Sequence, residues 1–212
     1  MRNHGHFERL RVGFWRMAVL AAVCAVLGGC ARAVKLRPVA ADAVVVAFGD
    51  SLTSGVGAEP GQDYPAVLAT LTGWQVVNAG VSGELSRAGL ARLPSVLEEH
   101  RPALVLLCHG GNDILAGNPP DTLAANLDAM IRLCREAGAE VVLLAVPQKG
   151  LTLRPAPLYA EVAERNNVPL VAEAVAEVLR RNALKSDYVH PNAAGYARIA
   201  AAVQAAVERA QR

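Results

Sequence analysis

The chain has 212 residues, of which 53% are hydrophobic and 4% aromatic, and its formal net charge is +2. This length and apolar content predict one compact domain with a sizeable core filled mainly by Ala, Val and Leu, plus a short appendage. Residues 1–29 carry a net +3, so the remainder carries 2 − 3 = −1, which excludes a basic face for nucleic acid. We expect a monomer without a nucleic-acid partner.

The four cysteines are Cys24, Cys30, Cys108 and Cys134. No pair has the spacing of metal ligands or of a Cys-x-x-Cys redox motif, so we expect neither a metal site nor redox chemistry. Cys108 and Cys134 are most simply interpreted as small buried hydrophobic residues. A disulfide bond between these two stays open as an alternative in an oxidising compartment.

The first thirty residues have the pattern of an export signal. A basic leader, residues 2–16, precedes the apolar run 17–27, which is shorter than the ~20 residues that a membrane-spanning helix needs. This run fits the apolar core of a secretory signal peptide. The Leu-Gly-Gly sequence before Cys30 resembles the lipobox of bacterial lipoproteins, which implies acylation of Cys30 as the new N-terminus.

These patterns predict the division of the chain. We expect residues 1–29 to be a lipoprotein signal peptide, residues 30–42 a short tether, and residues 43–212 the functional domain. The protein is then an exported bacterial lipoprotein, anchored to a membrane through acylated Cys30 and facing the periplasm or the cell exterior. The alternative is an ordinary signal peptide, or an N-terminal membrane anchor, with an incidental cysteine.

The rest of the chain alternates between strand-like and helix-like segments. Apolar runs predict buried strands at 44–48, 74–78, 103–108, 141–146 and 168–171. Helical patterns occupy residues 64–71, 90–100, 121–137, 158–165, 172–181 and 191–212. Asp121 is expected to be a helix N-cap, and Pro191 is expected in the first turn of the last helix. The alternation predicts an α/β fold with one parallel sheet and helices on both faces.

Four short polar motifs lie at the ends of predicted strands or just before a helix. They are Gly49-Asp50-Ser51, Gly80-Val81-Ser82-Gly83, Gly110-Gly111-Asn112-Asp113 and Asp187-Tyr188-Val189-His190. The carboxyl ends of parallel strands share one edge of a sheet, and open α/β sheets bind their ligands there. We therefore expect the first three motifs to meet at this edge.

Ser51, His190 and Asp187 have the side chains that nucleophilic serine chemistry needs. A serine hydroxyl attacks only when a base takes its proton, and histidine suits that role near neutral pH. Asp187 lies three residues before His190, close enough for its carboxylate to accept the Nδ1–H of the ring. These residues are therefore predicted to be the catalytic nucleophile, base and orienting acid.

Attack on an ester carbonyl places negative charge on its oxygen, which requires preorganised hydrogen-bond donors. The backbone N–H groups of Ser51 and Gly83 and the side-chain amide of Asn112 are the predicted oxyanion hole. Each motif alone is more typical of a turn than of a catalytic site, and only their combination favours catalysis. Asp50 is expected to orient its turn through backbone N–H groups, and His109 to have a structural or substrate-lining role.

At these motifs the chain resembles the SGNH (GDSL-type) hydrolase superfamily over about residues 43–205. Within it, the chain is most similar to the bacterial periplasmic thioesterase, lysophospholipase and arylesterase group. The resemblance implies a flavodoxin-like, three-layer α/β/α sandwich with a five-stranded parallel sheet, no metal or other cofactor, and an acyl-serine intermediate. It assigns the same residues by position: Ser51, Asp187 and His190 as the triad, and Ser51, Gly83 and Asn112 as the oxyanion hole.

The resulting hypothesis is a serine esterase that hydrolyses short or medium acyl esters, acyl thioesters or lysophospholipids. Its expected partners are a small-molecule acyl ester or lipid substrate and, through Cys30, a membrane. Two alternatives stay open at this point. One is an esterase that removes O-acetyl groups from a cell-envelope carbohydrate, and the other is a non-catalytic lipoprotein binding module.

Overall fold

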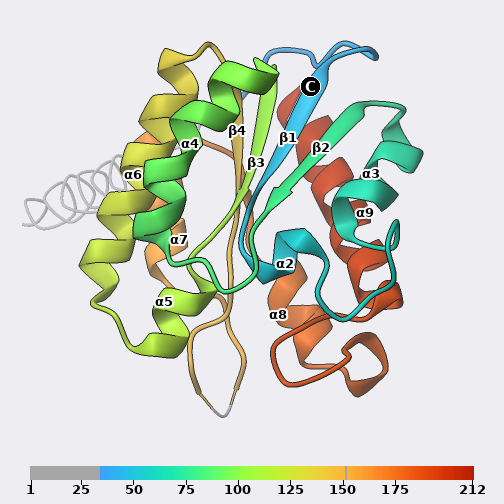
Figure 1. The fold of residues 1–212 in the computed structure, drawn as a ribbon, viewed down its shortest axis with the longest axis vertical. Helices are drawn as coiled ribbons and strands as arrows, with labels where there is room; N and C mark the ends of the chain where they lie inside the picture. The colour runs from blue at the N-terminus through green and yellow to red at the C-terminus, as the bar shows by residue number, and fades with distance from the viewer. Residues whose placement is uncertain (1–33, 151) are drawn as a thin grey trace, which may run out of the picture. The chain divides into compact units, whose positions relative to one another are not determined.

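A five-stranded parallel sheet lies between two layers of helices (Figure 1). In the sheet the strand order is β2-β1-β3-β4-β5, and every neighbouring pair is parallel. The strands are β1 (Val44–Gly49), β2 (Gln75–Gly80), β3 (Leu104–Cys108), β4 (Glu140–Leu144) and β5 (Leu170–Val171). This is the flavodoxin-like order of a doubly wound sheet, so the predicted fold class is confirmed.

The computed structural model describes residues 34–150 and 152–212, and Val34 to Arg212 form one compact unit. The predicted signal peptide, Cys30 and the first part of the predicted tether lie outside the described residues. Within the described part of the chain, no helix has the length and hydrophobicity that crossing a membrane requires.

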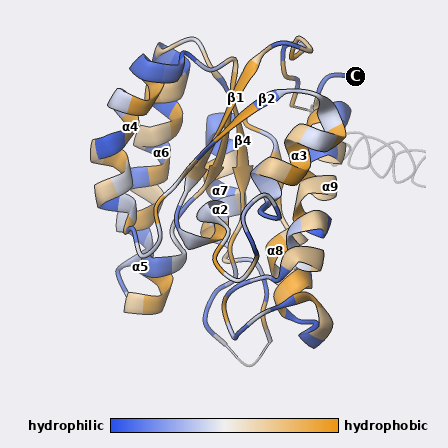
Figure 2. Ribbon diagram, turned by 45° about the vertical axis from the view of Figure 1, so that its right-hand side comes forward, coloured by the Kyte–Doolittle hydropathy of each residue, from blue (hydrophilic) through white to orange (hydrophobic). Residues whose placement is uncertain are grey.

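The central strands are apolar on both faces because helices cover both faces of the sheet. Val45 to Phe48 of β1 and all of β3 are buried, whereas the edge strand β2 is half-buried or exposed. Hydrophobic residues colour the strands in Figure 2, whereas α4 and α6 alternate between hydrophobic and hydrophilic residues. This explains why unbroken apolar runs, rather than alternating ones, mark these strands in the sequence.

Two groups of helices form the outer layers. On one face α4 (Ser86–His100) packs against α6 (Pro120–Glu136), and α6 packs against α7 (Leu158–Asn166). On the other face α9 (Ala193–Ala210) packs against α3 (Tyr64–Thr72) and α8 (Ala174–Leu179). Three shorter segments follow strands or precede the last helix: α2 (Ser51–Ser54), α5 (Gly111–Ala116) and the 3₁₀ helix Asn182–Leu184. The sequence patterns did not predict these three segments.

The structure corrects the expected roles of Asp121 and Pro191 at the starts of two helices. Helix α6 begins at Pro120 with Pro119 as its N-cap, so Asp121 lies in the first turn, where its charge favours the positive helix end, and does not cap it. Helix α9 begins at Ala193, and the Asn192 side chain caps it by accepting a 3.1 Å hydrogen bond from the Gly195 N–H. Pro191 therefore precedes the helix: proline lacks the side-chain acceptor that a cap needs, and asparagine supplies it.

The first described residues pack on the domain at the edge of the sheet where the strands begin. Leu36 is buried, and its N–H donates to the carbonyl of Ala210 at 2.8 Å. Arg37 forms an ion pair with Glu140, the first residue of β4. These residues belong to the segment predicted as a tether, so its described part already contacts the folded unit.

Cys108 and Cys134 are buried free thiols. Burial raises the pKa of both, that of Cys134 to about 12, so both stay uncharged at neutral pH. The interpretation of these cysteines as small core residues is confirmed, and the disulfide alternative is wrong.

Candidate active site

Ser51 lies where β1 ends and α2 begins. The Asp50 carboxylate caps α2 by accepting the Leu52 N–H at 3.1 Å, and its second oxygen accepts the Gly111 N–H at 3.2 Å. A Cβ atom at Gly49 would lie 2.0 Å from the carbonyl oxygen of Cys108. Glycine therefore allows β1 to pass close to β3 just before the nucleophile. Asp50 orients its own turn as expected, and it also binds the loop after β3.

The Ser51 hydroxyl, the His190 ring and the Asp187 carboxylate form a continuous relay, called here the serine relay. His190 Nε2 is 3.0 Å from Ser51 Oγ, and His190 Nδ1 is 2.8 Å from Asp187 Oδ2. The carboxylate only accepts hydrogen bonds, so Nδ1 carries the proton and Nε2 is free to accept the serine proton. The structure thus brings together three side chains from distant parts of the sequence.

Local hydrogen bonds hold Asp187 in this position. Its Oδ1 atom accepts the backbone N–H groups of Val189 and His190, each at 2.8 Å. Partial burial opposes ionisation, but the hydrogen bonds from the His190 ring and these two N–H groups outweigh it and hold the pKa of Asp187 below its usual range. Asp187 is therefore a carboxylate at neutral pH, which is the form that orients the imidazole.

The loop between α8 and α9 is folded so that His190 points to Ser51. Lys185 and Pro191 pair in a short antiparallel bridge, and the Ser186 N–H donates to the His190 carbonyl at 2.9 Å. From α9, the Tyr196 hydroxyl donates to the Val56 carbonyl at 2.7 Å, which joins this helix to the segment after α2. The helix that follows His190 is thereby connected to the segment that follows the helix of Ser51.

The three predicted oxyanion donors lie on separate segments. The Ser51 N–H is in the first turn of α2, where helices have no internal acceptor. Gly83 is exposed in the turn after β2, has a φ of 78° that favours glycine, and its N–H donates to no described residue. The Asn112 amide donates one hydrogen bond, of 3.0 Å, to the Glu84 carbonyl, which leaves its second N–H free for a ligand.

A cavity of about 240 Å³ opens beside the hydroxyl of Ser51. Ser51, Asn112 and His190 line it together, whereas Gly83 does not and is connected only through its neighbour Glu84. The apolar part of the wall includes Leu52, Ile114, Leu115, Val146, Pro147, Leu153, Leu179 and Val189. The volume equals about eight waters, which suits a short or medium acyl chain.

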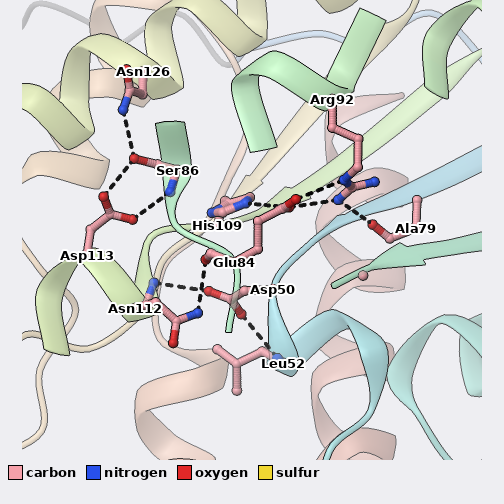
Figure 3. A network of polar contacts seen from close by, with 12 residues as sticks. Asp50, Leu52, Ala79, Glu84, Ser86, Arg92, His109, Asn112, Asp113 and Asn126 are labelled. Atoms are coloured by element: carbon pink, nitrogen blue, oxygen red, sulfur yellow. Dashed lines mark hydrogen bonds and ion pairs between the residues drawn. The ribbon is translucent and has the colours of Figure 1, made fainter. Parts of the chain in front are cut away.

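Three residues near the site form a largely buried network that the sequence motifs did not predict (Figure 3). The Glu84 carboxylate accepts hydrogen bonds from Arg92 and from Nε2 of His109, and we call these three residues the Glu84 network. His109 is fully buried and does not line the cavity, so of its two expected roles the structural one holds. No spacing or periodicity in the sequence connects these three positions, and the one local signal is the polar side chain of His109 directly after the apolar run of β3.

Among the described residues, no three His, Cys, Asp or Glu side chains are arranged to hold a metal ion. The polar groups around Ser51 are instead a hydroxyl, an imidazole, a carboxylate and amide donors. This set can remove a proton from an attacking oxygen and stabilise an oxyanion.

Comparison with known proteins places the chain among related enzymes. Residues 47–198 match the GDSL-like lipase/acylhydrolase family. The chain is 36% identical over 186 residues to Esterase TesA of Pseudomonas aeruginosa, covering 82% of this chain and 92% of that protein. It is 35% identical over 166 residues to Thioesterase 1/protease 1/lysophospholipase L1 of Escherichia coli K12, covering 74% and 78%.

The fold shows the same relationship. A crystal structure of TesA superposes with a TM-score of 0.72 and 31% sequence identity, over 78% of this chain and 98% of the other. The family match spans more than half of the chain, and the resemblance inferred from the motifs is confirmed. The chain belongs to the GDSL-like lipase/acylhydrolase family, and it is an ester hydrolase.

Proposed function

We propose that Ser51, His190 and Asp187 are the catalytic triad of a serine esterase that acts on short and medium acyl esters and thioesters through an acyl-serine intermediate. One observation carries this proposal: the serine relay is continuous, with 3.0 Å between Ser51 Oγ and His190 Nε2 and 2.8 Å between His190 Nδ1 and Asp187. These distances are within the range that proton transfer requires.

The reaction then follows from the arrangement. Ser51 Oγ bonds to the carbonyl carbon while His190 Nε2 takes its proton, and the carbonyl oxygen becomes an oxyanion held by Ser51 N–H, Gly83 N–H and Asn112. When the tetrahedral species collapses, the bond to the leaving alcohol or thiol breaks and His190 returns the proton to it. Water repeats the same two steps on the acyl-serine and releases the acid and the free hydroxyl.

The cavity supports the choice of acyl group. Its walls are mainly hydrophobic and its volume is about 240 Å³, below the roughly 300–1,000 Å³ of sites for drug-sized ligands. Related proteins are named as a thioesterase and a lysophospholipase. We therefore propose hydrophobic acyl chains of short or medium length as substrates, rather than the acetylated cell-envelope carbohydrate of the alternative hypothesis, which would favour a polar groove.

The test is a chain-length series. Hydrolysis of p-nitrophenyl esters from acetate to dodecanoate is measured for the protein and for a Ser51→Ala variant. We expect a rate maximum at short or medium chains, and reaction of the parent with a fluorophosphonate at a single serine. A Ser51→Ala variant as active as the parent would contradict the proposal, and absence of both turnover and labelling would favour the binding-module alternative.

We also propose that residues 1–29 are removed and that acylated Cys30 anchors the protein to a membrane. The lipobox-like sequence before Cys30 supports this. Val34 lies four positions after Cys30, which even a fully extended chain spans in at most ~14 Å, and Leu36 and Arg37 contact the edge of the sheet opposite to Ser51. The anchored enzyme would then direct its catalytic edge away from its own leaflet.

A fatty-acid probe tests the anchor. Cells that express the protein are grown with a clickable fatty acid, and we expect label on the wild type and none on a Cys30→Ala variant. An unlabelled wild type, or a Cys30→Ala variant that keeps the label, would contradict the anchoring proposal while leaving the esterase proposal intact.

A further inference from the structure

Glu84 follows Gly83 directly and is the centre of the Glu84 network (Figure 3). Its two carboxylate oxygens accept the Arg92 guanidinium in a fork, at 2.9 Å from Nε and 2.8 Å from Nη2. His109 Nε2 lies 3.1 Å from the same carboxylate. The Glu84 side chain is only 7% exposed and His109 is fully buried, while the Arg92 side chain is 28% exposed, so the carboxylate itself is largely shielded from solvent.

The partners of Glu84 are fixed to the three strands around the site. Arg92 Nη2 also donates to the Ala79 carbonyl of β2 at 3.1 Å, and its guanidinium lies 4.3 Å from the ring centroid of Phe48 in β1. His109 follows β3 directly. The Glu84 side chain therefore ties an exposed turn to the carboxyl ends of β1, β2 and β3.

The backbone of the same residue positions a second segment. The Glu84 carbonyl accepts the Asn112 amide at 3.0 Å, and this bond sets the rotation of a planar group whose other N–H is free. Gly83 precedes Glu84, so the orientation of the Gly83 N–H depends on the same short turn. Two of the three proposed oxyanion donors are thus held through one residue.

The burial of this network is costly for a role in stability alone. A buried ion pair repays the loss of hydration only in part, and apolar residues of similar volume are often as stabilising. His109 Nδ1 is buried without a partner among the described residues, which adds to the cost. Apolar side chains could not fix the direction of the turn. Hydrogen bonds are directional, and those to the Glu84 carboxylate hold the turn in one orientation relative to the three strands.

We propose that Glu84 is a positioning residue for ester hydrolysis, which sets the geometry of the oxyanion hole through the backbone of Gly83 and the amide of Asn112. Arg92 and His109 hold its carboxylate in place. This inference rests on the proposed function of Ser51, because an oxyanion hole has meaning only where the serine attacks.

A Glu84→Gln variant tests the proposal, because glutamine keeps the shape of the side chain but cannot accept the Arg92 fork with both terminal atoms. We expect kcat to fall roughly 10- to 100-fold, with KM nearly unchanged because Glu84 does not line the acyl cavity. An alkyl boronic acid, which forms a tetrahedral adduct with an active-site serine, should bind more weakly by the same factor. Rates are normalised to active sites by the end point of fluorophosphonate labelling.

A double-mutant cycle distinguishes positioning from general destabilisation. If Glu84 acts through the Asn112 amide, Glu84→Gln should lose much of its effect on kcat in an Asn112→Ala background. The matched control is the ion pair of Arg165 with Asp128, which also forms a fork, with distances of 2.7 to 2.9 Å, but joins α7 to α6 away from the site. Asp128→Asn should leave kcat and boronic acid binding unchanged.

The possible outcomes separate this inference from the proposed function. A Glu84→Gln enzyme with the parental kcat and boronic acid affinity, or effects that multiply fully with Asn112→Ala, would overturn the positioning role while Ser51→Ala remains inactive. An active Ser51→Ala enzyme would overturn both proposals. If Glu84→Gln does not fold, Arg92→Lys carries the test, since lysine cannot form the fork, and a parental kcat would again overturn the role.

Discussion

The serine relay and the Glu84 network lie side by side but are built in opposite ways. In the relay, the Asp187 side chain is 51% exposed and contacts a histidine three residues away. In the network, the Glu84 side chain is 7% exposed and His109 is fully buried, and the partners of Glu84 lie 8 and 25 residues away in the sequence. The carboxylate of the relay is thus half-exposed and held by a near neighbour in sequence, whereas the carboxylate of the network is buried and held by residues from two other segments.

The largest effect should come from breaking the relay at the nucleophile. Ser51→Ala removes the attacking oxygen, and we expect turnover of p-nitrophenyl esters to fall roughly 10⁴-fold or more. The substitution deletes one atom and leaves the Asp50 cap in place, so the melting temperature should barely change. An unfolded Ser51→Ala protein would show that the relay also carries stability.

A smaller loss is expected at the exposed end of the relay. Asp187→Asn cannot hold the imidazole tautomer that accepts the serine proton, and we expect kcat to fall roughly 10³-fold. Because the Asp187 side chain is half exposed, thermal unfolding should stay close to that of the parent. A Glu140→Gln variant, which removes an acid on the opposite edge of the sheet, serves as the control with parental kcat.

The free energy of unfolding should respond in the reverse order to kcat, with a larger loss in the network than in the relay. Burial opposes ionisation of Glu84, but its hydrogen bonds with Arg92 and His109 outweigh this and hold the pKa of the carboxyl below its usual range. Removing one partner of a buried pair typically costs about 3 kcal/mol or more, so Glu84→Gln should lower the free energy of unfolding well beyond Asp187→Asn. Denaturant unfolding near neutral pH measures both.

The difference in unfolding free energy between the parent and Glu84→Gln should depend on pH in a defined direction. A carboxyl whose pKa is lowered by folding stabilises the protein fully above its unfolded pKa of about 4.3, and the contribution is lost as the pH falls through the folded value. The gap in stability between the parent and Glu84→Gln should therefore persist to about pH 4 and shrink only in stronger acid. A gap that disappears at higher pH would show that the carboxylate is not held by Arg92.

The smallest effect concerns the cavity. Leu115 is 48% exposed and lines the cavity, so Leu115→Trp should narrow the entrance without disturbing the core. We expect the rate ratio of octanoate to acetate esters to fall about 10-fold, with the acetate rate nearly unchanged. An equal loss for both esters would place the acyl chain elsewhere.

The contrast between relay and network also explains what the sequence could predict. Asp187 and His190 are three residues apart, so their contact follows from chain geometry alone. Ser51 and Asn112 each follow a buried parallel strand, and the shared edge of such strands predicts that they meet. The unbroken apolar run before Ser51 identified the strand because both faces of the sheet are covered.

Other features depend on contacts that no local pattern encodes. The Glu84 network joins an exposed turn, a helix and the end of β3, and the sequence does not state how α4 lies against the sheet. The approach of His190 to Ser51 depends on the bridge between Lys185 and Pro191, which folds the preceding loop back. Asn192 rather than Pro191 defines the start of α9 for a local reason, since its side chain reaches the Gly195 N–H.

The most direct test of the account is the site of covalent modification by a fluorophosphonate. Intact mass spectrometry of the labelled protein, followed by peptide mapping, should show one adduct on Ser51 and none on a Ser51→Ala variant. An adduct on another serine, such as the exposed Ser82 beside Gly83, or an unmodified Ser51 in protein that hydrolyses esters, would contradict the central claim that Ser51 is the nucleophile.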